Sequence, residues 1–396
     1  MSTDELHDEP TPVEGRLIDA HCLLLDEPEP RDVAYNHTIF CQTSLPYRNP
    51  GDDVREVTRK NGAITVEFTA GKVLDRNGDF APIGLPYGPR ARLVLIHLMT
   101  QAVLNRSPRV ELEDSLTAFA RSLGLANGGR DIRTLREQMR RMAACSVHIG
   151  VDLRRVPQAK AAAVQLQAHL VEGLQLYMPK EPRQRVLWPS YVELNHRFFD
   201  HLLQHAVPLD PRALEGLKHS AAALDFYQYL AQRLHRVKSS RGTLVPWRAL
   251  HQQLGGGSRH VTPWKANFLG GRRRADGKRR AGVLSQVLAV YPAAAEAVEV
   301  RENGLHLRQA EPPVPKWGYV QQRRASLGGG EIRKRLQPVE TLPPNDPRHI
   351  QADENNPACP GCGHRATLTT WEARGDCALC GTCLDGSNSS DPRSRK

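Results

Sequence analysis

The spacing of apolar positions predicts a compact first region built from short strands and helices. A strand is expected near Gly62, because Ile64, Val66 and Phe68 alternate with polar residues. Asn77-Gly78 predicts a turn after it. The run Pro89–Leu104 is apolar almost all round, which is typical of a helix at the centre of a domain. A strand at 110–112 and a helix over 115–123 should follow, with Asp114 as a good N-cap.

A second helix in this region carries two opposed stripes. In Ile132–Met142 the apolar residues lie on one side, and Arg133, Arg136, Arg140 and Arg141 fall mostly on the other. A strand over 145–151 comes next, and 171–177 is expected to pair with it as a hairpin. The predicted order is therefore helix, turn, basic helix and hairpin.

The same order is predicted between residues 220 and 307. An amphipathic helix carries apolar residues every three or four positions, at Leu224, Tyr227, Leu230, Leu234 and Val237. A strand at 243–245, a helix at 246–254, a basic run over 265–280 and a helix at 282–291 follow. Alternating residues over 298–307 predict a closing hairpin. Three helices followed by a two-stranded wing indicate a winged helix, in which one helix enters a DNA groove.

These patterns predict an α+β chain, mostly helical, with two tandem winged-helix domains and a small C-terminal zinc ribbon. The expected boundaries are an acidic disordered tail at 1–34, a first winged-helix domain at 35–178 and a DNA-reading winged-helix domain at 190–312. Residues 179–189 are rich in proline and charge and are typical of a linker. A flexible linker at 313–356, the zinc ribbon at 357–385 and a disordered tail at 386–396 complete the chain.

Charge favours a polyanionic partner. The 396 residues carry a formal net charge of +11, although residues 1–32 hold ten acidic residues against two basic ones. That acidic stretch indicates a solvated tail, or alternatively a segment that mimics nucleic acid. The predicted phosphate-contacting residues are the cations of the basic run and three arginines of the helix over 132–142: Lys265, Arg272, Arg273, Arg274, Lys278, Arg279, Arg280, Arg133, Arg136 and Arg140. A solvated charged loop is the alternative for the basic run.

Cysteine spacing predicts a metal. Cys359 and Cys362, with Cys377 and Cys380, form two Cys-x-x-Cys pairs that suit a closed, structural Zn²⁺ site. Cys383 or His364 could replace a ligand, and a redox pair or an iron–sulfur cluster are alternatives. No signal peptide or membrane span is recognisable, so a cytoplasmic location is expected. Isolated Cys22, Cys41 and Cys145 are interpreted as structural or free thiols.

Enzymatic motifs are scarce. No glycine loop ending in Lys-Ser or Lys-Thr is present, which argues against an ATPase of that type. His196, His201 and His205 share helical spacing, and a polar helix face near the domain boundary is favoured over metal binding. The prediction is a protein without catalytic activity, with a relaxase or primase as the enzymatic alternative.

Several short motifs resemble the plasmid-encoded RepA family of replication initiators over roughly residues 35–315. In the first half they are Leu85-Pro-Tyr-Gly88, Leu112-Glu-Asp-Ser-Leu116, Leu123-Gly-Leu125, Gly128-Gly129 and Leu135-Arg-Glu-Gln-Met-Arg-Arg141. In the second half they include Leu224-Asp-Phe-Tyr227, Leu288-Ala-Val-Tyr-Pro292 and Gly304-Leu-His-Leu307. The resemblance implies an initiator that binds origin repeats in double-stranded DNA, promotes duplex opening and recruits the host replication initiator and helicase machinery.

The resemblance also implies that a homodimer is common among such proteins. Residues 254–282 depart from the family pattern, and the cysteine-rich end lies outside the similar region. A zinc-containing winged-helix transcriptional regulator is the alternative function.

Overall fold

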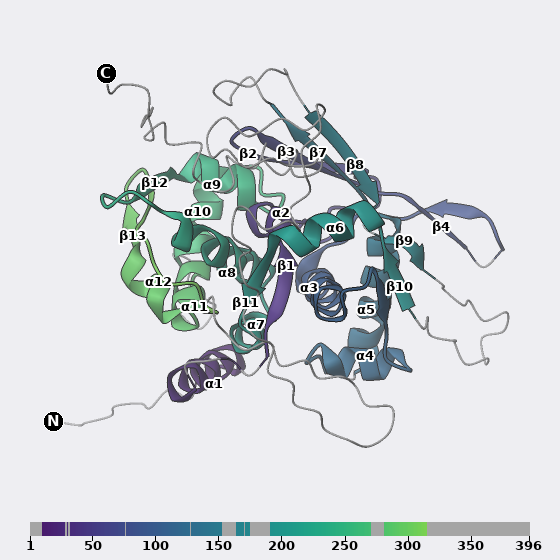
Figure 1. Cartoon of the computed structure of the whole chain (residues 1–396), viewed down its shortest axis with the longest axis horizontal. Helices are drawn as coiled ribbons and strands as arrows, with labels where there is room; N and C mark the ends of the chain where they lie inside the picture. Colours follow the sequence, from purple (N-terminus) through teal and green to yellow (C-terminus); the bar gives the residue numbers. More distant parts are fainter. Residues whose placement is uncertain are drawn as a thin grey trace, which may run out of the picture.

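The chain is a mixed assembly of helices and antiparallel strands (Figure 1). The computed structural model describes residues 10–27, 30, 32–75, 77–126, 128–152, 164–169, 171–174, 191–270 and 281–314. These residues do not include the predicted zinc ribbon, the C-terminal tail at 386–396, most of the linker at 313–356 or most of the basic run. Within them, no helix is long and apolar enough to cross a membrane.

The first unit, residues 88–194, contains three helices and a three-stranded sheet. Helices α3 (Gly88–Asn105), α4 (Leu116–Ser122) and α5 (Gly129–Ala144) lie close to the bounds expected from the apolar pattern. The sheet is formed by β6 (Arg109–Glu111), β9 (Val171–Leu174) and β10 (Tyr191–Leu194). Its strand order is β6-β10-β9, and both pairings are antiparallel.

A second sheet interrupts this unit between α5 and β9. Strands β7 (Ser146–Val151) and β8 (Val164–His169) join β2 (Glu56–Asn61) and β3 (Ile64–Thr69) in the order β2-β3-β7-β8. The predicted hairpin between 145–151 and 171–177 is therefore wrong. Strand β3 has a buried face, formed by Ile64, Val66 and Phe68, and it pairs with β7 in a register that places Phe68 opposite Val147, while β8 pairs with the other edge of β7. Strand β9 pairs with β10 instead.

The expected boundary before residue 190 needs the same correction. Strand β10, which was expected to open the second domain, pairs with β6 and β9 and closes the first sheet. Its Val192 and Leu194 side chains are buried in that unit. The connection to the second unit comes later, through α6 (His196–His205), β11 (Ala206–Leu209) and α7 (Pro211–Leu217).

The second unit, residues 221–307, repeats the strand order of the first. Its helices are α8 (Ala221–Arg233), extended by a short 3₁₀ turn (Leu234–Arg236), α9 (Trp247–Leu254), α10 (Val261–Leu269), α11 (Val283–Ala289) and α12 (Pro292–Ala297). Its strands are β12 (Thr243–Pro246), β13 (Val298–Arg301) and β14 (Gly304–Leu307). They form an antiparallel sheet in the order β12-β14-β13, with the hairpin β13–β14 as predicted.

The N-terminal segment holds a helix where a disordered tail was expected. Helix α1 (Pro12–Asp26) starts with Pro12 and a capping box, in which Thr11 and Glu14 satisfy each other's backbone amides. Leu17 and Ala20 are buried against α7 and α11. The acidic residues obscured this short apolar face, which is what fixes the helix on the body.

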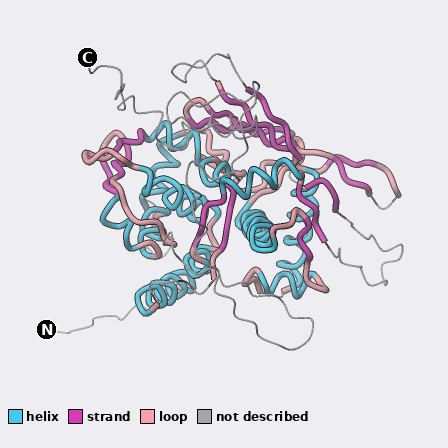
Figure 2. The backbone as a smooth tube through the Cα atoms, in the orientation of Figure 1, coloured by secondary structure: helices cyan, strands magenta, loops and turns pink. Residues whose placement is uncertain are grey.

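The two units are joined by a buried seam. Strand β1 (Ala34–His37) pairs antiparallel with β11, and α2 (Thr38–Gln42), which follows it, packs on α8 (Figure 2). Arg92 of α3 holds Asp225 of α8 through Nε and Nη2, at 2.6 and 2.7 Å, and both side chains are at most 4% exposed. The backbone carbonyls of Leu45, Pro46 and Gly88 accept the remaining guanidinium N–H groups. The buried apolar residues accordingly form one continuous core across both units.

Candidate nucleic-acid interface

Helix α5 presents the arginine stripe that the sequence predicts. Leu135, Met139 and Met142 bury one face of the helix. Arg133 and Arg136 are exposed. Arg140 is half-buried, and its Nη1 lies 3.8 Å from Oε2 of Glu137. Arg130, which sequence reasoning did not single out, extends the same exposed stripe by one turn. The water-facing side of α5 therefore carries four arginines.

Two neighbouring arginines, Arg141 and Arg90, instead hold α5 in place. Arg141 is buried and donates to Glu137 and Asp52, each at 2.8 Å, and to the carbonyl of Leu85 at 3.2 Å. These carboxylates outweigh its desolvation and raise the pKa of the guanidinium. Arg90 forms an ion pair with Asp131 in the first turn of α5. This separates the arginines that fix α5 from those that face water.

Helix α10 has a different character. Trp264 and Phe268 are buried and stack at 5.1 Å between ring centroids. Lys265 is the one predicted DNA-contacting cation that the described part of the second unit contains. Its Nζ donates to the carbonyl of Glu302 at 3.2 Å and lies 4.7 Å from the centroid of the Trp247 ring. Lys265 thus ties α10 to the turn of the β13–β14 hairpin.

The hairpin turn is held to α9 as well as to α10. The indole Nε1 of Trp247 donates to the carbonyls of Glu302 and Arg301, at 3.0 and 3.3 Å. Helix α10 ends at Gly270, whose φ of 86° is easily reached only by glycine. The remaining predicted cations of the run, at positions 272, 273, 274, 278, 279 and 280, follow directly and lie outside the described residues.

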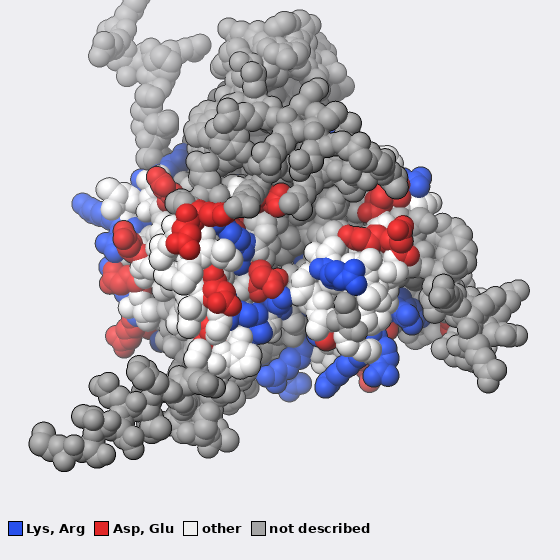
Figure 3. All heavy atoms as spheres, turned by 90° about the horizontal axis from the view of Figure 1, so that it is seen from below, with Lys and Arg blue, Asp and Glu red and all other residues white. Residues whose placement is uncertain are grey.

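The second unit exposes other cations that the sequence analysis missed. Arg241 precedes β12, Arg248 lies on α9, and Arg259 lies just before α10, all exposed. They are single residues scattered among polar neighbours, so no run or stripe marks them in the sequence. On the face shown in Figure 3, basic and acidic side chains lie interspersed in small patches. Helices α5 and α10 lie on opposite sides of the α3–α8 seam in Figure 1.

The histidines expected on a polar helix face are partly buried at the seam. His196 is exposed. His201 stacks on His37, with ring centroids 4.8 Å apart, and contacts the tilted ring of His205 at 4.3 Å between centroids. His37 Nε2 and His201 Nδ1 are 2.6 Å apart and share a hydrogen bond. Burial lowers the pKa of His201 and of His205 to about 4, and lowers that of His37 as well.

Metal ligation finds no support in the part of the chain that the structure describes. No cluster of three or more His, Cys, Asp or Glu side chains there could hold an ion. Cys22, Cys41 and Cys145 are free thiols, as expected. The four predicted zinc ligands, Cys359, Cys362, Cys377 and Cys380, lie outside the described residues, as do Cys383 and His364.

The chain has distant likenesses among solved structures. A crystal structure of selenomethionine derivatives of domains 2 and 3 of RctB is 12% identical, covers 62% of this chain and 89% of its own, and gives a TM-score of 0.39. A second crystal structure of the same RctB domains is 11% identical, covers 59% and 80%, and gives a TM-score of 0.38. A comparison with curated proteins finds no match.

A family model matches the central part of the chain. The model described as plasmid encoded RepA protein matches residues 85–248, a range that begins before α3 and runs through the seam into α9. This range contains the motifs around Leu85, Leu112 and Leu135 that resemble the same family. Over these residues, the chain is similar to plasmid-encoded RepA proteins.

Proposed function

We propose that this protein is a plasmid replication initiator that binds repeated sequences in double-stranded origin DNA through its two units. The observation that carries the proposal is the repeated order of helices and strands, with an arginine-lined helix at the third helical position of the first unit. Similarity to the RepA family supports a role in replication, and the net charge of +11 favours a polyanionic partner.

Each unit is interpreted as a winged helix. In the second unit α8, α9 and α10 supply the three helices, β12 supplies the first strand, and β13–β14 forms the wing. In the first unit α3, α4 and α5 occupy the same places, and β9–β10 forms the wing. In such folds the third helix lies against a DNA groove, which assigns that position to α5 and α10.

The arginines of α5 suit phosphate contacts. Their stripe can follow a DNA backbone and supply affinity without dictating sequence. In the second unit this role falls to Arg241, Arg248 and Arg259 and to the predicted run at 272–280. Lys265 is assigned to holding the wing turn.

The further steps are proposed on the same basis. The chain acts without catalytic turnover: it promotes opening of the duplex and recruits the host replication initiator and helicase. The two Cys-x-x-Cys pairs, Cys359 with Cys362 and Cys377 with Cys380, are proposed to hold a structural zinc ion at the C-terminal end. Thiolates at this spacing fit Zn²⁺ and leave no open coordination position for chemistry.

Footprinting tests the central claim. The purified full chain is incubated with duplex DNA that flanks its own gene, over a series of salt concentrations. Protection of tandem repeats beside an A·T-rich tract, with affinity falling steeply as salt rises, is the expected result. Protection of a single palindrome would favour the transcriptional regulator. No protection of any duplex in dilute salt would refute the proposal.

A second assay tests initiation itself. The gene and its neighbouring DNA are placed on a replicon that lacks any other origin. Maintenance of that replicon in host cells is expected, and its loss on deletion of the repeats should follow.

A further inference from the structure

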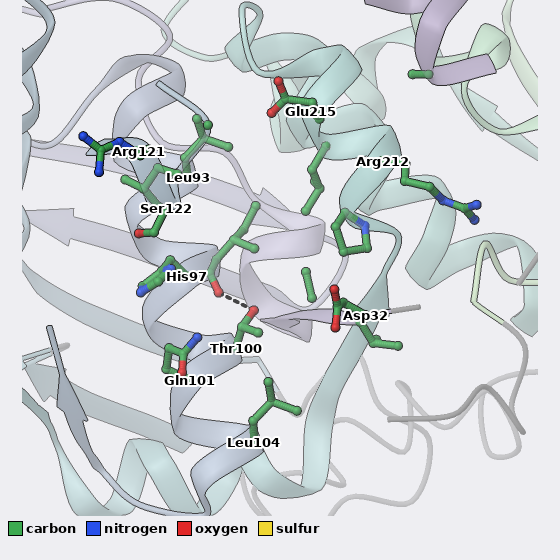
Figure 4. A pocket seen from close by; sticks show the side chains of 18 of the residues that line it. Asp32, Leu93, His97, Thr100, Gln101, Leu104, Arg121, Ser122, Arg212 and Glu215 are labelled. Atoms are coloured by element: carbon green, nitrogen blue, oxygen red, sulfur yellow. Dashed lines mark hydrogen bonds between the residues drawn. The ribbon is translucent and has the colours of Figure 1, made fainter. Parts of the chain in front are cut away.

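An open groove of about 910 Å³ lies where α1, α3, the end of α4, β1 and α7 meet. Figure 4 shows His97, Gln101 and Leu104 along α3 on one side, with Asp32, Arg212 and Glu215 on the other. The groove thus borders both the first unit and the connection to the second. Its size is at the upper end of what proteins use to bind a ligand or a peptide segment.

The groove contains buried polar atoms without a partner among the described residues. These are Nε of Arg16 on α1, Nε2 of His97 on α3 and Oε2 of Glu113 in the loop before α4; His97 and Glu113 also interact electrostatically with each other. Buried polar atoms are nearly always hydrogen-bonded, because an unmet donor or acceptor is destabilising. The Arg16 Nε and the His97–Glu113 pair therefore leave polar atoms in the groove that a bound segment can satisfy.

The charge of the groove is acidic once its internal pairs are removed. Arg212 is held by Asp210 through Nε and Nη2, at 3.0 and 2.7 Å, and Glu215 is paired with Lys218. The carboxylates of Asp19, Asp32 and Glu113 then face the guanidinium groups of Arg16 and Arg121. In a chain with a net charge of +11, this local excess of carboxylate disfavours DNA and attracts cations.

Part of the lining is apolar. Leu23 of α1 is exposed and Leu104 of α3 is half-buried in the groove, while Leu93, Ile96 and Leu214 are at most 7% exposed. An apolar surface with acidic groups around it matches a peptide that carries apolar side chains beside lysine or arginine. A metal ion would match the charge but not the apolar surface, and a polyanion would match neither.

From this combination we infer that the groove is a docking site for a basic amphipathic segment of a partner protein. Its apolar side chains contact Leu23 and Leu104, and its cationic groups meet Asp32 and Glu113. The docked segment would also contact α1, α3 and α7 together, so binding stabilises their present arrangement. The inference goes beyond the proposed DNA binding and does not depend on it.

Two synthetic helical peptides test the inference. They share one leucine pattern, and lysine in the first is replaced by glutamate in the second. Fluorescence anisotropy with the full chain, in the absence of DNA, should show saturable binding of the lysine peptide and none of the glutamate peptide. Binding should weaken as salt rises.

Groove variants locate the binding. Asp32→Asn with Glu113→Gln should weaken the lysine peptide about tenfold or more, because both opposing charges are lost. Gln101→Trp should weaken it by filling the groove. The matched control, Asp200→Asn with Glu296→Gln, removes two exposed carboxylates outside the groove and should leave binding unchanged. Circular dichroism checks that each variant is folded.

Three outcomes would overturn the inference: equal binding of both peptides, no binding of the lysine peptide, or equal loss in the control variant. Duplex DNA binding by the groove variants is measured separately and should match that of the unchanged chain. Failure of the proposed function would appear in that assay alone.

Discussion

The two units share one strand order but place their cations differently. In the first unit, Arg133 and Arg136 project from α5 into water, while the helix is fixed by Arg90 and Arg141. In the second, Lys265 of α10 is engaged by Trp247 and the carbonyl of Glu302. A shared topology therefore fixes where a helix lies but not what its exposed face can bind. The electrostatic role has to be argued residue by residue.

The units also differ in continuity. The second runs from α8 to β14 along the chain, whereas the first is interrupted by β7 and β8, which serve another sheet. Both are nevertheless joined into one core at the Arg92–Asp225 pair. Unfolding experiments can show whether the two units behave as separate bodies or as one.

The largest expected effect comes from the seam. Asp225→Asn leaves the Arg92 guanidinium buried and uncompensated, and should lower the free energy of unfolding by about 3–5 kcal/mol. The control is Arg90→Met on the same helix, which removes a partly exposed ion pair and should cost about 1 kcal/mol or less. Denaturant unfolding measures both. Two separated transitions in the Asp225 variant would show that the units unfold independently.

A second large effect should follow acidification of the seam. In the folded chain His201 and His205 have pKa values of about 4, whereas unfolded histidine titrates near 6.5. The unfolded state therefore binds more protons between these values, and stability should fall by a few kcal/mol as pH drops from about 6.5 towards 4. Chemical denaturation at a series of pH values measures this slope.

Variants assign that slope to the histidines. His205→Leu should flatten it by removing one group that titrates in this window. His196→Gln, at an exposed position on the same helix, should leave it unchanged. An unaltered slope in the His205 variant would place the acid sensitivity elsewhere.

A moderate effect should distinguish the two helices on DNA. Arg133→Ala with Arg136→Ala removes two water-facing cations and should reduce the slope of log affinity against log salt by about 1.8. Lys265→Met should leave that slope unchanged, because its ammonium group is already engaged by the carbonyl of Glu302 and by the Trp247 ring. Gel-shift titrations over a range of salt concentrations measure the slope for both variants. An unchanged slope in the double arginine variant together with a reduced slope in Lys265→Met would assign the phosphate contacts to α10 and not to α5.

The smallest effect concerns Lys265 itself. Loss of its cation–π contact and its hydrogen bond in Lys265→Met should cost about 1 kcal/mol of stability. Lys238→Met, at an exposed site in the same unit, is the control and should be near neutral. Thermal unfolding at equal ionic strength measures the difference.

Local patterns predicted much of the fold. The alternation at Ile64, Val66 and Phe68 marks β3, and the apolar run around Leu95 marks α3, because burial dictates both patterns directly. The arginine stripe of α5 was also readable, since one helical face repeats every three to four residues. The family resemblance predicted a more specific function than these patterns did alone.

The sequence did not predict which strands pair when they are far apart along the chain. Strand β9 lies about as far along the chain from β7 as from β10, so sequence separation does not decide between them. Both edges of β7 are already paired, one with β3 and the other with β8, and β9 pairs with β10. Helix α10 was missed because it lies between two glycine clusters and buries Trp264 and Phe268 without an extended apolar repeat. The engagement of Lys265 depends on a hairpin turn that is distant in sequence.

The pairing of β1 with β11 also constrains synthesis. Residues 34–37 leave the ribosome long before residues 206–209, so the nascent chain must hold its first strand unmatched while most of the first unit is made. An unsatisfied strand edge of this kind is prone to join another chain. A prematurely terminated product ending before residue 206 is therefore expected to aggregate, whereas the finished polypeptide has its own partner for that edge.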